Sequence, residues 1–403
     1  MKRGTVTGPI LGALWFVILA TTLCIVMSFF TGALFRPVIW LALVWGAGLG
    51  LAMIYLRKPV WGGIVPGTAA ALVLASFVGL SPIATGETVG PLTRVAVSVI
   101  LGATFALSQL RITQNCPPGP LTRHEFEAAV IRFLTGFGYL FFTAIVIIPF
   151  YVMVMTSLKS QQELLQNPLD FSVDLSKGWG LLRSYDELFA LFNFGTYLWT
   201  SFYVSVLTVL ITLLFSVPGA YAVARLRFAG RAAFSRSILL IYMVPMIVLA
   251  LPIYIVFSLT GLRNSIAGIV MIYPVTTIPV ALYMLQGYFR GLPSEVEDAG
   301  LMDGLSRLQV IWKITLPLSL PALASVSLYV FMIAWNEFLL AFMLLDDPSK
   351  FTLTRGVTML NSSEIPRQHL MAGAVIATVP IMALFLGLEK FMTKGLTAGS
   401  VKG

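Results

Sequence analysis

Charged residues, cysteine and histidine are all scarce in this chain of 403 residues, and each scarcity excludes a class of protein. Only 11% of the residues are charged, whereas soluble globular domains carry roughly 25%, so the chain is not a soluble domain. Two cysteines, Cys24 and Cys116, are too few for a disulfide framework. The only histidines, His124 and His369, are far apart in the sequence, so they predict no zinc site and no Ser/His/Asp triad.

A nucleotide-binding loop is also absent from the sequence. There is no G-x-x-x-x-G-K-[ST] motif and not even a Gly-Lys pair, so the chain has no P-loop for ATP. We therefore expect no enzymatic activity, no cofactor and no metal ion. The net charge of +9 does not indicate nucleic-acid binding, because the basic residues lie in short segments between apolar runs, as the positive-inside rule requires.

Long apolar runs dominate the chain, which is 58% hydrophobic with a mean hydropathy of +0.91. A spanning helix needs about 20 mostly apolar residues, and backbone groups in lipid must be satisfied within the segment, which favours helices. The first run follows Lys2 and Arg3 but has no small-residue cleavage site, so we interpret it as a retained span. The sequence predicts an all-α integral membrane protein with about ten transmembrane helices, at 10–30, 37–56, 60–80, 91–110, 133–156, 197–223, 234–257, 266–288, 321–345 and 371–391.

The basic residues between the spans predict the orientation. With both termini in the cytoplasm, 17 of the 26 Lys and Arg residues lie on the cytoplasmic side. The segment RLRFAGRAAFSR (225–236) is the clearest case, with four arginines and no acidic residue. We therefore expect a multi-pass protein of the cell (inner) membrane with both termini cytoplasmic. The loop at 290–320 then faces the cytoplasm as well.

A proline-rich stretch divides the chain. Pro117, Pro118 and Pro120, with Gly119 among them, break helices and favour an extended linker. The sequence predicts an N-terminal four-helix membrane region at 1–112, a cytoplasmic linker at 113–130, and a six-span core at 131–403. No inverted repeat of the kind found in many secondary transporters relates the two parts.

The loop at 290–320 carries the most informative motif, EDAGLMDGLSRLQVIWKITLP at 297–317. Ser294 and Glu297 form an S-x-x-E pattern that predicts a capping box and a short helix, which Gly304 ends. Small, acidic and apolar residues in the loop suit docking to another protein: Ala299, Gly300, Asp298, Asp303, Val310, Ile311 and Trp312. The alternative is an interfacial loop that only rests on lipid headgroups.

The spacing of this motif resembles the EAA-x3-G-x9-I-x-L-P loop of permease subunits of binding-protein-dependent ABC importers. The motif positions are Asp298, Ala299, Gly300, Gly304, Ile314, Leu316 and Pro317. Asp298 replaces Glu, which keeps the charge on a shorter arm, and Gly300 replaces Ala at a cost of about 1 kcal/mol in helix propensity. The resemblance implies that this loop, with Glu297, Asp303 and Arg307, is where the permease meets its ATPase.

The resemblance extends from about residue 131 to the end of the chain, which is similar to MalG-type permease subunits of carbohydrate importers. The matching stretches are PFYVMVMTSLKS (149–160), AYAVARLRFAGR (220–231), VPMIVLALPIY (244–254), AWNEFLLAF (334–342) and GLTAGSVKG (395–403). It implies a six-helix MalG/MetI-like permease core and a C-terminal tail that contacts the ATPase through Gly395, Thr397, Gly399 and Lys402. The first 125 or so residues have no counterpart in the family pattern.

The function that the resemblance implies is that of a transmembrane subunit in an ATP-driven importer of a sugar, such as maltose or maltodextrin. The implied partners are a second, MalF-like permease subunit, two ATPase subunits, an extracytoplasmic sugar-binding protein and membrane lipid, with no nucleic acid. Two alternatives stay open. A secondary transporter or channel would work without an ATPase and would need more ionisable groups in its spans. A membrane scaffold would not need the 290–320 loop.

Each of three features inside the predicted spans has two possible interpretations. Glu337, beside Trp335 and Asn336, either lines the sugar path or fixes the helix bundle through a polar contact. Pro245 and Pro252 either are hinge positions or reflect the general frequency of proline in membrane helices. The run GAGLG at 46–50 predicts close helix packing, within the chain or in a dimer.

Overall fold

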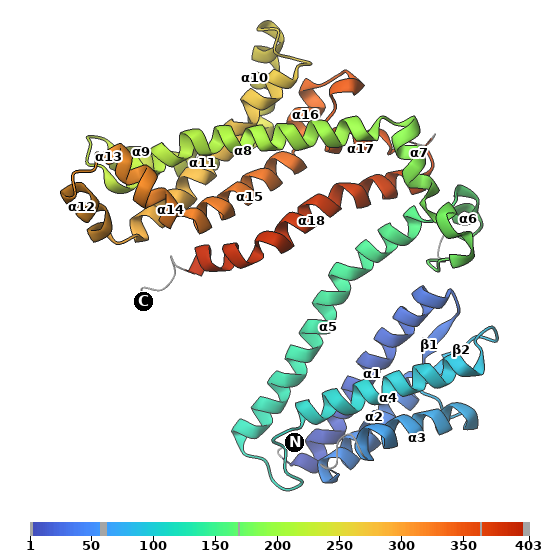
Figure 1. Ribbon diagram of the computed structural model, residues 1–403. Coiled ribbons are helices and arrows are strands. Elements are labelled where there is room, and N and C mark those ends of the chain that lie inside the picture. The colour runs from blue at the N-terminus through green and yellow to red at the C-terminus, as the bar shows by residue number, and fades with distance from the viewer. Residues whose placement is uncertain (1–2, 57–62, 168–169, 363–364, 398–403) are drawn as a thin grey trace. The chain divides into compact units, whose positions relative to one another are not determined.

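The computed structural model describes residues 3–56, 63–167, 170–362 and 365–397, and almost all of its regular structure is helical (Figure 1). The chain divides into two compact units, with the division between Gly178 and Trp179. The all-α membrane fold predicted from the sequence is confirmed. The pairing of two short strands was not predicted, because each strand is only three residues long and lies in a connection between two helices.

The first unit contains six helices and one strand pair. In chain order these are α1 (Gly4–Thr31), β1 (Phe35–Pro37), α2 (Ile39–Tyr55), α3 (Val65–Val78), β2 (Ile83–Thr85), α4 (Pro91–Ile112), α5 (Arg123–Ser157) and α6 (Gln161–Gln166). A 3-10 segment, η2 (Leu175–Leu182), runs across the division. The strands are antiparallel, with Arg36 opposite Ala84, and join the α1–α2 connection to the α3–α4 connection.

The second unit begins with α7 (Arg183–Leu191) and a long helix, α8 (Phe194–Arg225). It continues through α9 (Arg231–Tyr242), α10 (Met246–Leu259), α11 (Ile266–Gly291), α12 (Ser294–Met302), α13 (Arg307–Val310), η3 (Ile311–Thr315), α14 (Leu316–Leu318), α15 (Leu320–Asn336), α16 (Leu339–Leu344), η4 (Pro348–Lys350), α17 (Leu353–Met359) and α18 (Arg367–Thr397). In Figure 1, α8 runs along this unit with α11 and α15 beside it.

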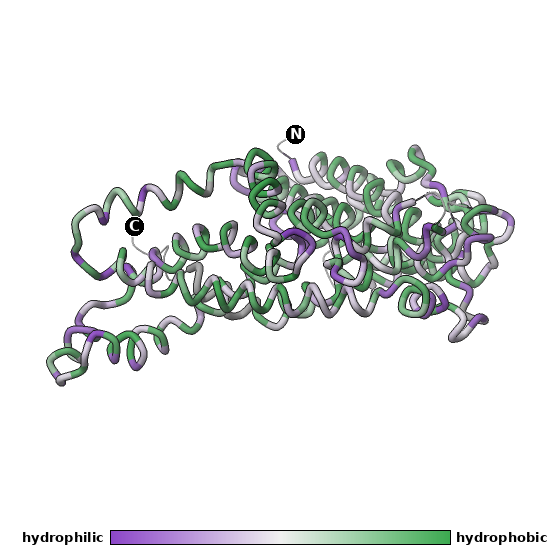
Figure 2. Tube along the Cα trace, turned by 90° about the horizontal axis from the view of Figure 1, so that it is seen from above, coloured by the Kyte–Doolittle hydropathy of each residue, from purple (hydrophilic) through white to green (hydrophobic). Residues whose placement is uncertain are grey.

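Six helices of the described residues are long and apolar enough to cross a membrane. They are α1, α4, α5, α8, α11 and residues 367–388 of α18, and they correspond to six of the ten predicted spans. The hydrophobic colour follows the helices in Figure 2, while hydrophilic residues gather mainly at turns and helix ends. This distribution fits helices that face lipid along their length and water at their ends.

The other four predicted spans are shorter or broken helices. The predicted spans at 37–56 and 60–80 are α2, with 17 residues, and α3, with 14. The span at 234–257 breaks between α9 and α10, where Pro245 is extended, because proline lacks an N–H and cannot continue a helix. The span at 321–345 breaks after Asn336. The candidate hinge Pro252 instead lies inside α10.

Glycines allow α1 and α2 to pack at backbone distance. A Cβ atom on Gly46 would lie 2.5 Å from the carbonyl oxygen of Gly12, and one on Gly50 would lie 2.6 Å from that of Gly8. Any larger side chain would therefore push the two helices apart. The close packing predicted for residues 46–50 is confirmed, and the partner is α1 of the same chain.

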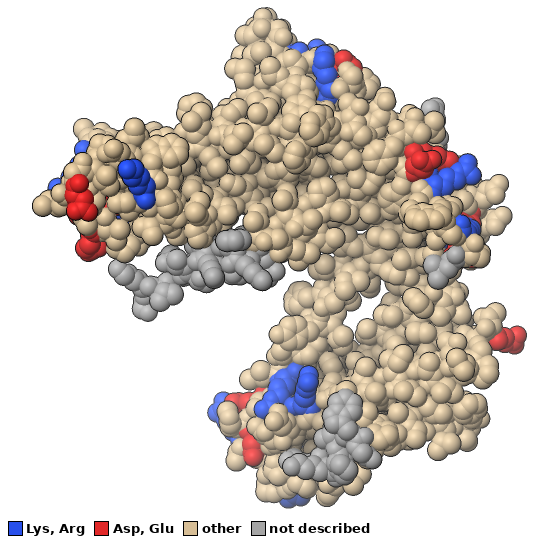
Figure 3. Space-filling model, in the orientation of Figure 1, with Lys and Arg blue, Asp and Glu red and all other residues tan. Residues whose placement is uncertain are grey.

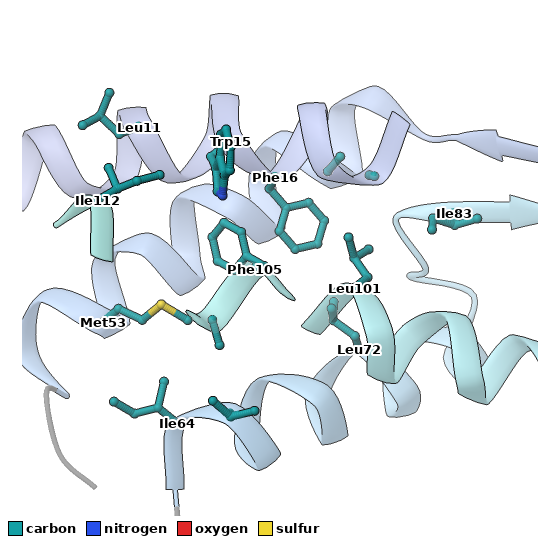
Figure 4. Close-up of a cluster of buried hydrophobic side chains, with 14 of the residues drawn as sticks. Leu11, Trp15, Phe16, Met53, Ile64, Leu72, Ile83, Leu101, Phe105 and Ile112 are labelled. Carbon is teal, nitrogen blue, oxygen red and sulfur yellow. The ribbon is translucent and has the colours of Figure 1, made fainter. Parts of the chain in front are cut away.

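Mainly aliphatic side chains, with a few aromatic rings among them, fill the interior of the first unit (Figure 4). The rings of Phe16 and Phe105 meet edge to face with centroids 4.9 Å apart, which joins α1 to α4. Trp15 donates a hydrogen bond of 2.6 Å from its indole nitrogen to the hydroxyl of Ser108. Burying a tryptophan is favourable when its N–H has a partner, so this contact stabilises the same helix pair.

The N-terminal helices also hold α5, the first span of the predicted core. Trp15 packs edge to face on Phe133, and a Cβ on Gly136 would meet the Trp15 ring at 2.9 Å. Further along, the hydroxyl of Tyr151 donates to the carbonyl oxygens of Phe29 and Phe171. These contacts group α5 with the N-terminal helices. The predicted functional boundaries, at 1–112, 113–130 and 131–403, stay a prediction.

An ion pair fixes the segment that follows α5. The ammonium group of Lys159, almost fully buried, lies 2.8 Å from the carboxylate of Asp170. Burial alone would raise the pKa of Asp170, but the hydrogen bonds from Lys159 and Ser172 outweigh it and lower the pKa to about 2. Since the folded pKa is below its ordinary value of 3.8, the pair stabilises the fold at neutral pH and loses this effect only in strong acid.

We predict that Gly46→Ala lowers the thermal unfolding midpoint of the purified protein in detergent. The new methyl group would lie 2.5 Å from the Gly12 carbonyl oxygen, and overpacking of this kind costs about 1–3 kcal/mol. Gly48→Ala is the matched control, because a Cβ there has no neighbour within 4 Å. Equal midpoints for the two variants would contradict the packing account.

Candidate functional site

The 290–320 loop forms a compact group of short helices at one end of the second unit, where α12, α13, η3 and α14 follow one another (Figure 1). Figure 3 shows few charged side chains on the visible face, and one group of them lies at this end. The loop ends in a bend of 77° between residues 307–318 and α15. The group is therefore a separate element at the end of the apolar helices.

The first helix of the loop begins where predicted, but no side chain caps its N-terminus. The helix α12 starts at Ser294 after Pro293. The predicted capping box of Ser294 and Glu297 is wrong, because the Glu297 side chain turns inward to other partners. A reciprocal capping box does form at α13, between Ser306 and Gln309.

Glu297 is the centre of a buried polar cluster. Its side chain is buried, and its carboxylate accepts hydrogen bonds from the hydroxyls of Tyr221, at 3.2 Å, and Thr315, at 3.0 Å. The Nε atom of Arg225 forms an ion pair with it at 3.4 Å. Removing one partner of a buried ion pair costs about 3–5 kcal/mol, because the other charge is left buried and unpaired, so these contacts fix the position of Glu297 against α8.

Two arginines extend the cluster on opposite sides. Arg225 donates through Nη2 to the carbonyl oxygen of Leu292 at 2.6 Å, which ties α8 to the end of α11. Arg307 in α13 interacts with the hydroxyl of Tyr221. We call Tyr221, Arg225, Glu297, Arg307 and Thr315 the Glu297 cluster. Four elements of the second unit, α8, α12, α13 and η3, contribute side chains to it.

Sequence reasoning missed Tyr221 and Arg225 as partners of the loop. The available signal was their spacing: two polar residues four positions apart lie on one face of a helix, at the end of the otherwise apolar α8. Such a pair at a helix end is usually interpreted as solvated, and only the fold shows that a carboxylate 72 or more residues later meets both.

The two motif glycines have different roles. Gly304 follows Asp303, the C-cap residue of α12, and marks the end of this helix as predicted. Its φ of +84° is strained for residues with a side chain, which favours glycine at this position. Gly300 is buried, and a Cβ there would lie 2.5 Å from Cδ1 of Ile314. The prediction that Gly300 allows a partner to approach is therefore wrong: its small size accommodates Ile314 of the same loop.

Acidic, apolar and basic side chains are all exposed on the loop. Six of the exposed residues are acidic, apolar or small, and we call them the exposed face: Asp298, Ala299, Met302, Asp303, Leu308 and Trp312. The basic residues Arg307 and Lys313 are exposed beside them. Met302 is 88% exposed, Leu308 65% and Trp312 66%. Val310, which was expected to contact a partner, is only 1% exposed and belongs to the loop's interior, and Ile311 is half-buried.

The last motif positions shape the entry to α15. Leu316 is half-buried and Pro317 is exposed within α14. The hydroxyl of Ser319 donates to the carbonyl oxygen of Thr315 at 2.6 Å, and Tyr288 donates to that of Leu318 at 3.1 Å. These two bonds satisfy carbonyl groups at the bend and attach it to α11.

The candidate path residues lie at the break between α15 and α16. Trp335 is buried and donates from its indole nitrogen to the carbonyl oxygen of Ala377 at 3.1 Å, which joins α15 to α18. Asn336 is exposed. The Glu337 carboxylate accepts from the backbone N–H groups of Leu340, at 3.0 Å, and Ala341, at 3.2 Å. Glu337 therefore satisfies the first N–H groups of α16, and a role in the sugar path stays a prediction.

The C-terminal tail is described only in part. Gly395 and Thr397 lie in the last turn of α18, which ends at Thr397. Gly399 and Lys402 lie outside the described residues. The contact of this tail with an ATPase stays a prediction.

The matched family covers the whole 290–320 loop. Residues 216–397 match the family described as "Binding-protein-dependent transport system inner membrane component". The chain is 36% identical over 269 residues to the inner membrane ABC transporter permease protein YcjP of Escherichia coli K12, a match that covers 66% of this chain and 95% of YcjP. The chain belongs to this permease family. Its relatives are transport subunits, not enzymes.

Other relatives of this permease are named for sugars. It is 32% identical to the trehalose/maltose transport system permease protein MalG of Thermococcus litoralis, over 69% of this chain and 99% of that protein. It is 30% identical to the arabinooligosaccharides transport system permease protein AraQ of Halalkalibacterium halodurans, over 68% of this chain and 98% of that protein. The permease is thus a carbohydrate importer subunit of the MalG type, and the resemblance seen in its sequence is confirmed.

A solved structure shares the fold of this permease. One chain of a bacterial ABC transporter that imports the acidic polysaccharide alginate aligns with a TM-score of 0.57 at 23% identity, over 67% of this chain and 98% of that chain. This likeness shows the fold, while the matched family and the named relatives identify the permease as a multi-pass inner-membrane protein and a transmembrane subunit of a sugar importer. Its family implies an ATPase and a binding protein as partners.

We predict that Glu337→Ala lowers the thermal unfolding midpoint in detergent, since it leaves the N–H groups of Leu340 and Ala341 without their acceptor. A buried donor without a partner costs about 1–3 kcal/mol. Asn336→Ala is the control, because the exposed Asn336 amide bonds only to Met332 of its own helix. An unchanged midpoint for Glu337→Ala, with transport lost, would instead favour a role in the sugar path.

Proposed function

We propose that this permease forms half of the translocation pathway of an ATP-driven importer, and that its 290–320 loop is the docking site of a separate ATPase subunit. The observation that carries the proposal is the two-sided construction of the loop. On its inner side, Glu297 is fixed to α8 by buried polar contacts. On its outer side, the exposed face presents apolar and acidic side chains together.

The composition of the exposed face favours a protein partner over lipid headgroups. Exposed aromatic and methionine side chains supply the apolar contact of interfaces, and Asp298 and Asp303 offer carboxylates to arginines of a partner. The cytoplasmic leaflet is negatively charged, so it repels carboxylates. A helix that rested on headgroups would be expected to carry lysine or arginine at positions 298 and 303, whereas the exposed basic residues of the loop, Arg307 and Lys313, lie outside α12.

The orientation required by this docking agrees with the charge distribution of the sequence. Both termini and the 290–320 loop would lie in the cytoplasm, where ATP is available. ATP binding would close two ATPase subunits, move the docked loops and switch the pathway from inward-facing to outward-facing. Hydrolysis would reset it. As in any two-state switch, the energy enters as a difference in binding between the two states.

The substrate we propose is an oligosaccharide such as maltose or maltodextrin. The sugars named for MalG of T. litoralis and AraQ of H. halodurans support this substrate class. A second, MalF-like permease subunit would complete the pathway, and an extracytoplasmic sugar-binding protein would deliver the substrate. In this permease, Trp335, Asn336 and Glu337 are the proposed path residues.

We predict that Asp298→Lys reduces the ATPase recovered with the tagged permease about tenfold or more. A repulsive charge at an interface costs several kcal/mol, and tenfold corresponds to about 1.4 kcal/mol. The measurement is mass spectrometry of partners after purification in mild detergent from the native membrane. The wild-type permease should bring an ATPase and a second permease subunit.

The control for this experiment is Glu87→Lys, which reverses the charge of an exposed carboxylate in the first unit. It should leave the recovery of ATPase unchanged. A wild-type chain that purifies alone and transports solute alone in vesicles would contradict the proposed function and support a secondary transporter or channel.

A further inference from the structure

We propose that Glu297 is a positioning residue that makes α12, the end of α8 and the approach to α15 move as one rigid body, so that motion of a docked ATPase reaches the spans. This inference rests on the proposed function. The Glu297 cluster is its structural basis: Glu297 is buried against α8 and η3, while Asp298 and Met302 of the same helix are exposed.

The adjacency of Asp298 and Glu297 is the first argument. Asp298 is exposed and Glu297 is 5% exposed, although they are consecutive residues of one helix. A partner that holds Asp298 is therefore one residue away from a carboxylate that is bound to α8 and η3. Little backbone lies between the two contacts that could absorb the motion by bending.

The distribution of the partners is the second argument. Tyr221 and Arg225 belong to α8, a helix of 32 residues that runs from this cluster along the second unit. Thr315 belongs to the segment that bends by 77° into α15. Arg225 also binds the carbonyl oxygen of Leu292, directly after α11. The carboxylate thus joins α12 directly to α8 and η3, and Arg225 links the same site to the end of α11.

The chemical nature of the contact is the third argument. Apolar packing would hold a short helix as well or better, because a buried ion pair contributes little net stability compared with hydrophobic residues of similar volume. A carboxylate that takes one hydroxyl donor and one cation from α8 and a second hydroxyl donor from η3 has its full set of partners in only one arrangement of the three elements. Buried polar contacts of this kind are best known for fixing register, which is the property that a transmitting element requires.

The test measures the distance between spin labels in the intact complex. Ser294 on α12 and Leu210 on α8 are exposed, so the spin labels are attached through Ser294→Cys and Leu210→Cys. The native Cys24 and Cys116 are buried. The purified complex is compared with ADP and with ATP plus vanadate. In the otherwise wild-type permease, we expect one narrow distance distribution that is the same in both states, because α12 and α8 move together.

Glu297→Gln should broaden this distribution in both nucleotide states while the ATPase still co-purifies and still hydrolyses ATP. Tyr221→Phe, which removes one hydroxyl donor and conserves the ring, should broaden it less. Glu295→Gln is the matched control, since it makes the same change at an exposed position of the same helix, and its distribution should stay narrow.

A distribution that stays narrow in both Glu297→Gln and Tyr221→Phe would overturn the inference and leave the docking site intact. If Glu297→Gln loses the ATPase and Tyr221→Phe retains it, Tyr221→Phe decides the test. A narrow distance distribution in Tyr221→Phe would then overturn the inference. A wild-type permease without an ATPase would overturn the proposed function and this inference together.

Discussion

A polypeptide in lipid has no water to satisfy its backbone N–H and C=O groups, and this constraint governs the architecture of the permease. Unbroken helices satisfy it along α1, α4, α5, α8, α11 and α18. At three breaks between helices, a side chain or a proline accounts for backbone groups that would otherwise lack a partner. Glu337 binds the first N–H groups of α16, Pro245 supplies no N–H, and Ser319 binds a carbonyl oxygen at the bend before α15. The irregular positions are therefore fixed in geometry.

The 290–320 loop differs from the apolar helices because it carries several charged side chains, some buried and some exposed. Within about 20 residues the chain buries a carboxylate and exposes two others, Asp298 and Asp303, beside large apolar side chains. The buried group organises the end of the second unit, and the exposed groups offer a surface to a partner. In the proposed function this surface is the docking site of an ATPase, a partner that membership in the family of binding-protein-dependent permeases implies.

The sequence predicted the elements whose signal is local. Long apolar runs located the six full spans, Ser294 and Gly304 located the ends of α12, and the glycines at 46–50 indicated close helix packing. It failed where the deciding contact comes from elsewhere in the chain. The S-x-x-E pattern predicted a cap, but Tyr221 and Arg225 draw Glu297 inward. Val310 has the composition of a contact residue, and only the fold shows it buried.

The most direct test of the central claim is a photocrosslinking amino acid at position 302, where Met302 is 88% exposed at the tip of α12. Illumination of native membranes is followed by mass spectrometry of the crosslinked products. The account predicts a crosslink to an ATPase subunit from position 302 and none from position 310, which is buried inside the loop. Crosslinks from position 302 to lipid alone would contradict it and identify the loop as an element of the membrane surface.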